Sequence, residues 1–338
     1  MRRLLVLLLL ALLLLGGGSL ALWFWTVGRL RAGFDTWTQQ VAAEGWTVRT
    51  GDIRRAGWPF AADLVLRDMT LSAGPDVVPG GLRWSAAQAV LHLSPLAPDV
   101  LEIRLAGQQR LRLAREPEAP FEAASFVLAV PLPGPAPVQL AARDLRFAAP
   151  VEGMSIGLLD GQAQQTPQAV TFELSAEAIA LPPPPAPQPA LGGRIASATV
   201  AGVLDGPLPP PSPDPATRAS AWQKSGGVLR VRHLALGWGP LGVTGSGVLG
   251  LDTGLQPRGS GTVRLVGYER ALTVLAAGGA IRPADAQAIR AVLTLLASTP
   301  EGGGAPQVQL PLALKDGVLR AGDIPVGRVP HWDWSAGP

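Results

Sequence analysis

The stretch Leu101-Glu102-Ile103-Arg104-Leu105 decides the fold class, because apolar and charged side chains alternate along it without interruption. Successive side chains of a β-strand point to opposite faces, so this alternation predicts a strand with one apolar and one polar face. The same pattern flanks this stretch at 89–93 and at 110–113. It returns later in the chain at 229–231 and at 308–314, so strands of this kind recur through most of the sequence.

Such strands are typical of an antiparallel sheet that is covered on one side only. We therefore predict a mainly β protein built on a long curled antiparallel β-sheet, arranged either as a groove or as a sandwich. The abundance of glycine (41) and proline (34) agrees, because both residues disfavour long helices. The candidate apolar groove-facing residues are Leu91, Leu93, Leu101, Ile103, Leu105, Leu229, Val231, Leu310 and Leu312.

Turn signals separate the predicted strands. Asp160-Gly161, Asp205-Gly206 and Asp316-Gly317 are candidate hairpin turns. The proline-rich stretches 131–137, 182–189 and 207–215 cannot join a sheet ladder and are predicted to be extended loops or linkers. The last two bracket a short predicted strand at 192–204. A domain boundary there and a single sheet that crosses it are both open.

Residues 4–27 contain no charged side chain, whereas Arg2 and Arg3 precede them and Arg29 and Arg31 follow them. A helix of this length, at ~1.5 Å per residue, covers the ~30 Å hydrocarbon core of a bilayer. A cleaved secretory signal is the alternative, with Ser19-Leu20-Ala21 as its cleavage site. We favour the uncleaved anchor, because the apolar run continues past Ala21 into an aromatic cluster suited to a membrane interface.

Two further helical regions are predicted. Leu30, Phe34, Trp37 and Val41 recur every three or four residues, and Gly45 suits a helix C-terminus, so 28–45 is predicted as a juxtamembrane helix. Residues 268–277 and 283–299 predict a helical hairpin lying across the sheet. The predicted organisation is therefore an anchor (1–27), the juxtamembrane helix (28–45), a β-rich periplasmic domain (46–330) and a C-terminal tail (331–338).

Composition excludes several classes of protein. A formal net charge of +3 over 338 residues gives no nucleic-acid footprint. The absence of cysteine excludes a disulfide framework, a thiolate metal site and a cysteine-linked lipid anchor.

No convincing catalytic constellation is present. Gly237-x-Gly239-x-x-Gly242 and Gly245-x-Gly247-x-x-Gly250 fit the dinucleotide fingerprint, but Pro240 and the strand-like sequence that follows favour a glycine-rich β-hairpin. Asp252-Thr253-Gly254 resembles an aspartic-protease loop, yet that chemistry needs a second carboxylate. The three histidines, at 92, 233 and 331, lack metal-ligand spacing. We therefore predict that the protein is not an enzyme and has no catalytic residue, cofactor or metal site.

Three separated segments together resemble the bacterial domain of unknown function 2125 family. They are Gly57-Trp58-Pro59-Phe60, the segment Gly237-Trp238-Gly239-Pro240, and the C-terminal stretch that begins at 310 and contains Asp316-Gly317. The resemblance implies a membrane-anchored envelope protein of a Gram-negative bacterium, without an established activity. It also implies structural roles for Gly57, Pro59, Phe60, Gly237, Trp238, Gly239, Pro240, Asp316 and Gly317. A more distant similarity to AsmA-type envelope proteins implies an apolar groove associated with phospholipid.

These observations lead to two main hypotheses. In the first, the protein is tethered to the inner membrane and binds or helps to move lipid or another hydrophobe on an apolar sheet face in the periplasm. In the second, it is a structural protein with a closed β-sandwich and no ligand. Its proline-rich loops, Trp332 and Trp334 would then dock an envelope protein partner. An enzyme, with Asp252 as its only candidate residue, comes third.

Overall fold

A computed structural model describes residues 2–75, 77–78, 80–113, 116–132, 134, 136–149, 153–182, 191–207, 214–299, 305–332 and 334. Side chains are described from Gly16 onward. Within these residues the chain is mainly β, with one 18-stranded sheet and four helices. Every strand pair is antiparallel, as the alternating strands predicted.

The elements follow one another along the chain with short connections. The helices are α1 (Arg2–Ala43), α2 (Pro215–Lys224), α3 (Tyr268–Ala277) and α4 (Pro283–Leu296). The first strands are β1 (Trp46–Arg49), β2 (Ile53–Ala56), β3 (Ala62–Ala73), β4 (Leu82–Ser94), β5 (Ala97–Leu113), β6 (Ala119–Glu122), β7 (Ser125–Pro131), β8 (Val138–Phe147) and β9 (Ser155–Gln165). The remaining strands are β10 (Ala169–Ala180), β11 (Arg194–Asp205), β12 (Val228–Trp238), β13 (Leu241–Leu251), β14 (Pro257–Val266), β15 (Ala297–Ser298), β16 (Gln307–Lys315), β17 (Val318–Ala321) and β18 (Ile324–Arg328).

The sheet is a meander in which almost every strand pairs with its neighbours in sequence. β1 and β2 both pair with β3 and form one edge of the sheet, whereas β18 pairs with β17 and forms the other. β6 and β7 lie in succession between β5 and β8. The described strands form no second sheet. The closed sandwich of the alternative hypothesis is therefore not the fold.

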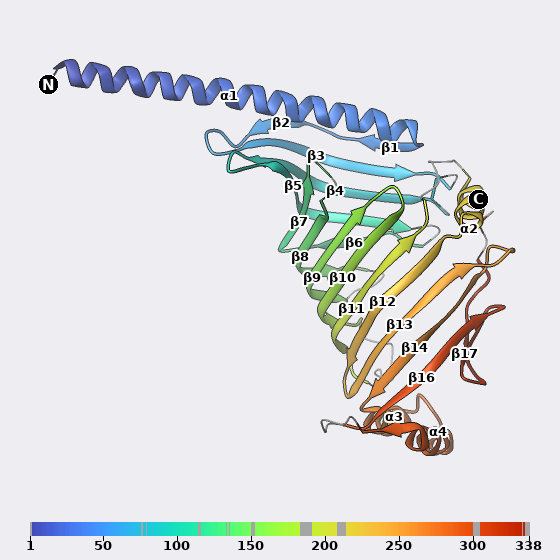
Figure 1. Cartoon of the computed structure of the whole chain (residues 1–338). Helices are drawn as coiled ribbons and strands as arrows, with labels where there is room; N and C mark the ends of the chain where they lie inside the picture. Colours follow the sequence, from blue (N-terminus) through green and yellow to red (C-terminus); the bar gives the residue numbers. More distant parts are fainter. Residues whose placement is uncertain are drawn as a thin grey trace.

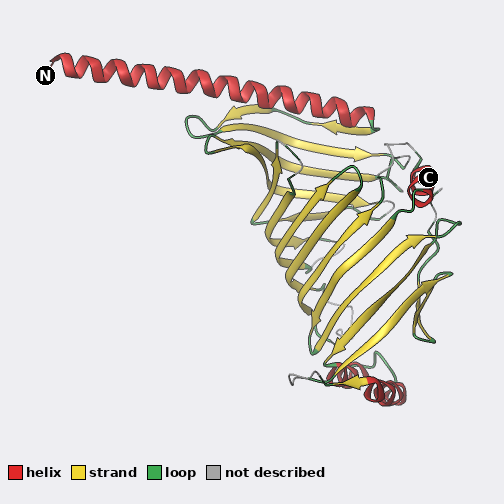
Figure 2. Ribbon diagram, in the orientation of Figure 1, coloured by secondary structure: helices red, strands yellow, loops and turns green. Residues whose placement is uncertain are grey.

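The sheet twists strongly along its length. β3, β4 and β5 run alongside α1, whereas the strands from β7 onward cross this direction steeply (Figure 1). The N-terminal part of α1 extends well beyond the sheet, and α3 and α4 lie at the opposite end of the molecule (Figure 2). Right-handed strand twist accumulates over many strands and accounts for this change of direction.

The predicted anchor and juxtamembrane helix form one uninterrupted helix, α1. It ends where Gly45 adopts φ +89°, a left-handed conformation that glycine allows without steric cost. Phe34 is buried against Leu64, Leu66 and Leu91 of β3 and β4, so the C-terminal half of α1 packs on the sheet as its apolar stripe predicted. In the part of the chain with described side chains, which leaves out 1–15, no helix is long and apolar enough to span a membrane.

Of the predicted hairpin turns, the structure confirms Asp316-Gly317. Both residues have positive φ (52° and 71°), and they join Lys315 to its partner Val318 as a two-residue turn of the hairpin type. The prediction at Asp160-Gly161 is wrong, because both residues lie within β9. Gly161 faces the Leu174 side chain on the next strand, and an added Cβ would lie 3.0 Å from Leu174 Cδ1. Asp205-Gly206 ends β11 and leads toward α2, so it is not a hairpin turn either.

Helix α2 was not predicted, because its first residue belongs to a proline-rich stretch. Pro215 occupies the first turn, where a proline needs no backbone donor, and the carboxylate of Asp214 accepts hydrogen bonds from the Ala216 and Thr217 amides. Positions 133, 135, 183–189 and 208–213 of the predicted loops lie outside the described residues. β11 follows the second of these loops and precedes the third. It pairs with both β10 and β12, so the sheet continues across the proposed boundary.

The C-terminal helical hairpin is confirmed, but its position differs from the prediction. α3 and α4 lie at the ends of β14 and β16 rather than across the sheet (Figure 1). Tyr268 and Leu272 of α3 are buried against Val308 of β16. Because these contacts involve only the ends of the strands, the helices leave most of the sheet face uncovered.

Candidate functional site: an apolar sheet face with a groove under helix α1

Strand register places the predicted apolar residues on one face of the sheet. Side chains of directly paired residues in an antiparallel sheet lie on the same face. One row of paired positions runs from β3 to β16 and contains only aliphatic residues and glycine. Its members are Leu64, Leu91, Ile103, Leu128, Leu140, Gly161, Leu174, Val200, Leu234, Gly245, Val263 and Leu310.

The other predicted residues belong to rows on this same face. Leu93 pairs with Leu101, and Leu105 pairs with the buried Ala89. At the far end of the sheet the pairs contain Leu229, Val231 and Leu312, opposite Leu249, Gly247 and Gly261 respectively. All the candidate groove-facing positions therefore share one apolar face, although they come from strands far apart in the sequence.

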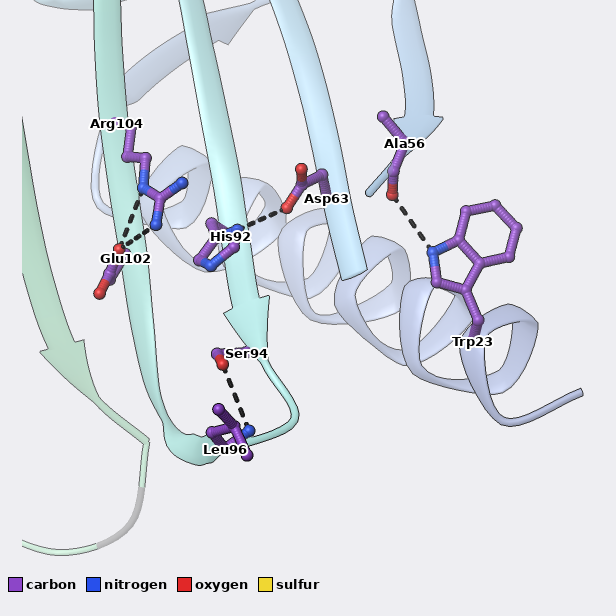
Figure 3. A network of polar contacts seen from close by, with 8 residues as sticks. All are labelled: Trp23, Ala56, Asp63, His92, Ser94, Leu96, Glu102 and Arg104. Carbon is purple, nitrogen blue, oxygen red and sulfur yellow. Dashed lines mark hydrogen bonds and ion pairs between the residues drawn. The ribbon is translucent and has the colours of Figure 1, made fainter. Parts of the chain in front are cut away.

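The opposite face is polar. One of its rows contains Asp63, His92, Glu102, Ala129, Gln139, Gln162, Glu173, Ala201 and His233. On this face His92 Nδ1 lies 2.7 Å from Asp63 Oδ1, and Arg104 pairs with Glu102 at 2.6 Å (Figure 3). The polar face therefore holds a half-buried histidine–carboxylate contact and an exposed ion pair, which leaves the apolar face as the candidate binding surface.

The apolar face is hollowed into a groove of about 1460 Å³ beneath α1. Leu91, Leu93, Leu101, Ile103 and Leu105, all predicted, line its floor. Its polar lining residues are Ser19, Thr26, Arg29 and Ser94. The remaining lining includes Trp23, Trp25, Leu30, Phe34 and Trp37 of α1 and Leu66, Met69, Leu71, Trp84, Phe126, Leu128, Val130, Leu132, Val138 and Leu140 of the sheet region.

Leu229, Val231, Leu310 and Leu312 lie outside this groove. Leu310 packs near the helical hairpin, in the cluster around Tyr268 and Val308. Between the groove and the hairpin the apolar face stays open: Leu174 is 41% exposed and Leu234 is 42% exposed. The face is thus a continuous apolar strip that α1 covers at one end and the hairpin bounds at the other.

Sequence reasoning missed the contribution of β7, β8 and α1 to this site. Phe126, Leu128 and Val130 of β7 are separated by Val127 and Ala129, which are also apolar, so alternation could not have shown which of these residues face the groove. Trp37 of α1 belongs to the predicted apolar stripe, whereas Trp23 and Trp25 were assigned to a membrane interface and not to the groove. Their part in the groove depends on how the helix lies over the sheet.

The residues considered for catalysis have structural positions. The Asp252 carboxylate accepts hydrogen bonds from the Gly254 and Gln256 amides, both at 2.8 Å, and so shapes the turn between β13 and β14. Gly237, Gly239 and Gly242 belong to the β12–β13 hairpin, as predicted, with Trp238 paired to Leu241. Within the described ranges no three His, Asp or Glu side chains cluster closely enough to hold a metal ion.

Comparison with family models gives one match. The model of a family described as "Uncharacterized protein conserved in bacteria (DUF2125)" matches residues 23–330. The chain belongs to this family. Searches of curated proteins and of solved structures found no match. Membership of the DUF2125 family therefore brings no known ligand or reaction to the groove.

The segments that carried the family resemblance occupy tight turns in this DUF2125 protein. Gly57 has φ +94°, and an added Cβ would come within 2.6 Å of the Ala61 carbonyl oxygen. Gly57 opens the β2–β3 turn, which contains a cis Trp58-Pro59 bond and presents Phe60 to solvent.

The central motif forms the tip of the β12–β13 hairpin. The Trp238 indole donates a hydrogen bond to the Gly192 carbonyl oxygen at 2.9 Å. Gly239 approaches Leu191 so closely that a Cβ would lie 2.6 Å from its carbonyl oxygen, and Pro240 lies against Gly267 in the same way. Like the Asp316-Gly317 turn, these hairpin positions fix the ends of strands and lie outside the groove lining, whereas Pro59 of the first segment does line the groove.

Proposed function

We propose that this DUF2125 protein is tethered to the bacterial inner membrane by residues 4–27, with the rest of the chain in the periplasm. There it binds, or helps to move, lipid or another hydrophobic ligand on the apolar sheet face. The uncharged run at 4–27 and the basic residues on both sides of it support the tether. We also propose, as part of the same hypothesis, that this protein is distantly similar to AsmA-type envelope proteins.

The groove beneath α1 is the observation that carries the binding proposal. Its volume of about 1460 Å³ exceeds the ~300–1,000 Å³ of ordinary small-molecule pockets. A long flexible hydrophobe fits such a lining, because each CH₂ group removed from water contributes about 0.8 kcal/mol. Bound lipid would also cover apolar side chains that the fold leaves half-exposed.

The interaction hypothesis loses one of its recognition elements. Trp334 is not a free side chain: its indole donates a hydrogen bond to the Leu255 carbonyl oxygen at 2.8 Å. The Gln256 side chain holds the backbone of Trp332 through two further hydrogen bonds, at 2.9 and 3.0 Å. This part of the C-terminal tail is thus docked on the β13–β14 turn. An envelope protein partner stays the second candidate, and we propose no enzymatic activity.

Native mass spectrometry of the full chain, purified from a Gram-negative envelope and combined with lipid extraction, tests the binding proposal. We expect stoichiometric phospholipid that survives purification. A mass that corresponds to protein alone, with no lipid in the extract, would contradict the proposal. A protein partner would then be the better explanation of the open apolar face.

A further inference from the structure

Large apolar side chains protrude from loops at one end of the first strands. Phe60 is 85% exposed and Trp58 is 51% exposed in the β2–β3 turn, and Leu96 is 97% exposed between β4 and β5. Leu132, at the end of β7, is 53% exposed, and its amide donates a hydrogen bond to the Asp99 carbonyl oxygen at the start of β5. We call these four residues the apolar rim.

The loops that carry the rim contain no charged residue. The segments are 57–61 (Gly-Trp-Pro-Phe-Ala), 94–98 (Ser-Pro-Leu-Ala-Pro) and 131–137 (Pro-Leu-Pro-Gly-Pro-Ala-Pro). Exposed turns normally carry polar residues, because their backbone and side chains face water. Uncharged loops with bulky apolar tips are typical of a surface that is not in water when the protein functions.

The rim lies at the same level of the molecule as residues 19–25 of α1. The Trp23 indole donates to the Ala56 carbonyl oxygen at 3.2 Å, immediately before the β2–β3 turn (Figure 3). The groove lining likewise joins Ser19 and Leu22 of α1 to Pro59 and Pro95 of the rim loops. The remaining N-terminal residues of α1, which include most of the uncharged run, project past this level (Figure 1).

Apolar side chains are also exposed on α1 itself at this level. Leu22 is 61% exposed, Phe24 is 50% exposed and Trp25 is 63% exposed. With the rim on its sheet side, the helix is surrounded by apolar groups. A protein partner would cover one side of such a band, whereas a bilayer covers all sides at once.

Arginines mark the boundary of this band toward the body of the protein. The Arg29 guanidinium lies over the Trp25 ring, 5.6 Å from its centroid, and Arg55 is exposed one residue before Ala56. Aromatic residues followed by basic residues are the usual order at a membrane interface, where arginine meets lipid phosphates.

We infer that the apolar rim inserts into the interface of the bilayer that holds residues 4–27, so that the groove opens directly onto lipid. This inference rests on the proposed tether and deepens the proposed binding function. Leu132 of the rim lines the groove, as do Pro59 and Pro95 of the loops that carry the rim, so an acyl chain could pass from the leaflet to the groove without crossing water. Such a path avoids exposing each CH₂ group to water at about 0.8 kcal/mol.

Site-specific fluorescence on the full chain tests this inference, and the absence of native cysteine makes single-cysteine labelling clean. The single-cysteine variants Phe60→Cys and Leu96→Cys are labelled with an environment-sensitive fluorophore. The labelled proteins are then reconstituted into vesicles of phosphatidylethanolamine and phosphatidylglycerol. Leu295→Cys is the matched control, because Leu295 is 87% exposed but lies on α4 at the far end of the sheet. Leu12→Cys reports on the tether.

We expect a quencher attached to lipid tails to remove most fluorescence at positions 12, 60 and 96 and little at position 295. Aqueous iodide should give the reverse order. If 60 and 96 behave like 295 while 12 is quenched by lipid, the rim inference is wrong and the tether stands. If 12 is also accessible to iodide, the tether fails and the inference fails with it.

A second measurement separates the rim from the groove. The Phe60→Ser, Leu96→Ser double variant should retain lipid added in detergent, because neither side chain belongs to the groove lining. Its uptake of lipid from vesicles should become slower than that of the unsubstituted chain. An unchanged uptake rate would contradict direct entry from the bilayer.

Discussion

The indole Nε1 of Trp23 donates a hydrogen bond to the carbonyl oxygen of Ala56, 3.2 Å away, and this bond joins α1 to β2 (Figure 3). The two residues are 33 positions apart in sequence. Their contact fixes the position of the sheet along the axis of α1. It therefore also fixes the level of the groove and of the apolar rim relative to residues 4–27.

Trp23→Phe should loosen this junction. The substitution keeps an aromatic ring but removes the donor, so about 1 kcal/mol of stability should be lost. Hydrogen exchange should become faster in β2 and in the turn that follows it. Trp25→Phe is the control, because Trp25 is 63% exposed. Equal exchange in the two variants would show that the Trp23 bond does not hold β2.

Leu128→Gln should weaken lipid binding. Leu128 lies in the groove, opposite Ile103 on β5, and a polar amide there removes apolar contact with two or three CH₂ groups. The expected loss is roughly 2 kcal/mol, or about thirtyfold in affinity. The readout is lipid titration by native mass spectrometry.

Val127→Gln is the matched control for Leu128→Gln. Val127 is the preceding residue on the same strand, is also half-buried, and pairs with Arg104 on the polar face. This variant should bind lipid as the original chain does. An equal loss in both variants would indicate a general effect on β7 instead of a groove contact.

Gln109→Met should stabilise the fold. Gln109 is 1% exposed, and among the described residues neither polar atom of its amide has a hydrogen-bond partner. Such an unpaired buried group costs about 1–3 kcal/mol, which methionine of similar shape avoids. Thermal unfolding should shift to higher temperature, whereas Gln139→Met, on the exposed face of β8, should leave it unchanged. A lower unfolding temperature for Gln109→Met would mean that the amide makes a stabilising contact, which would contradict this prediction.

Gly57→Ala should destabilise the β2–β3 turn. Gly57 has φ +94°, and the added Cβ would lie 2.6 Å from the Ala61 carbonyl oxygen and 2.9 Å from the Asp63 carboxylate carbon. A loss of roughly 1–3 kcal/mol in the free energy of unfolding is expected. Gly74→Ala provides the control, since its Cβ would meet no described atom within 4 Å. Comparable unfolding midpoints for the two variants would contradict the steric explanation.

Helix α2 should lose its N-terminal cap in acid. The hydrogen bond from the Thr217 hydroxyl is the main cause that lowers the pKa of Asp214 below its usual 3.8. Desolvation opposes it, and the hydrogen bonds from the Thr217 and Ala216 amides lower the pKa further. A carboxyl group with a lowered pKa stabilises the folded state fully above its unfolded pKa, and this contribution is lost as pH falls through the folded pKa. Hydrogen exchange of the α2 amides, corrected for the intrinsic effect of pH, should therefore become less protected below about pH 4.

Asp214→Ala separates this cap from other effects of acid on α2. The variant should show reduced protection of α2 already at neutral pH, with no further loss through the acid range. A normal acid-dependent loss in Asp214→Ala would place the responsible group elsewhere.

Much of the fold could be predicted from local sequence, because strand alternation, turn residues and helical stripes each depend on only a few neighbouring residues. Alternation at 101–105 identified two-faced strands, the Asp316-Gly317 pair identified a hairpin, and Pro283 with the apolar stripe that follows it identified α4. The same local rules failed at Asp160-Gly161, where the pair lies inside β9 because β8 and β10 pair with it on both sides. They also failed at Pro215, where the capping carboxylate of Asp214 converts a proline-rich loop into a helix start.

The sequence by itself determined which side chains are apolar on each strand, since a period of two sets the face of every residue. Only the tertiary structure decided that these faces join into one open strip rather than two facing sheets. That result depends on the register of successive strands and on the accumulated twist, which no single segment encodes. The groove is likewise tertiary: it exists because the Trp23–Ala56 bond and the packing of Phe34 hold α1 over β3, β4 and β5.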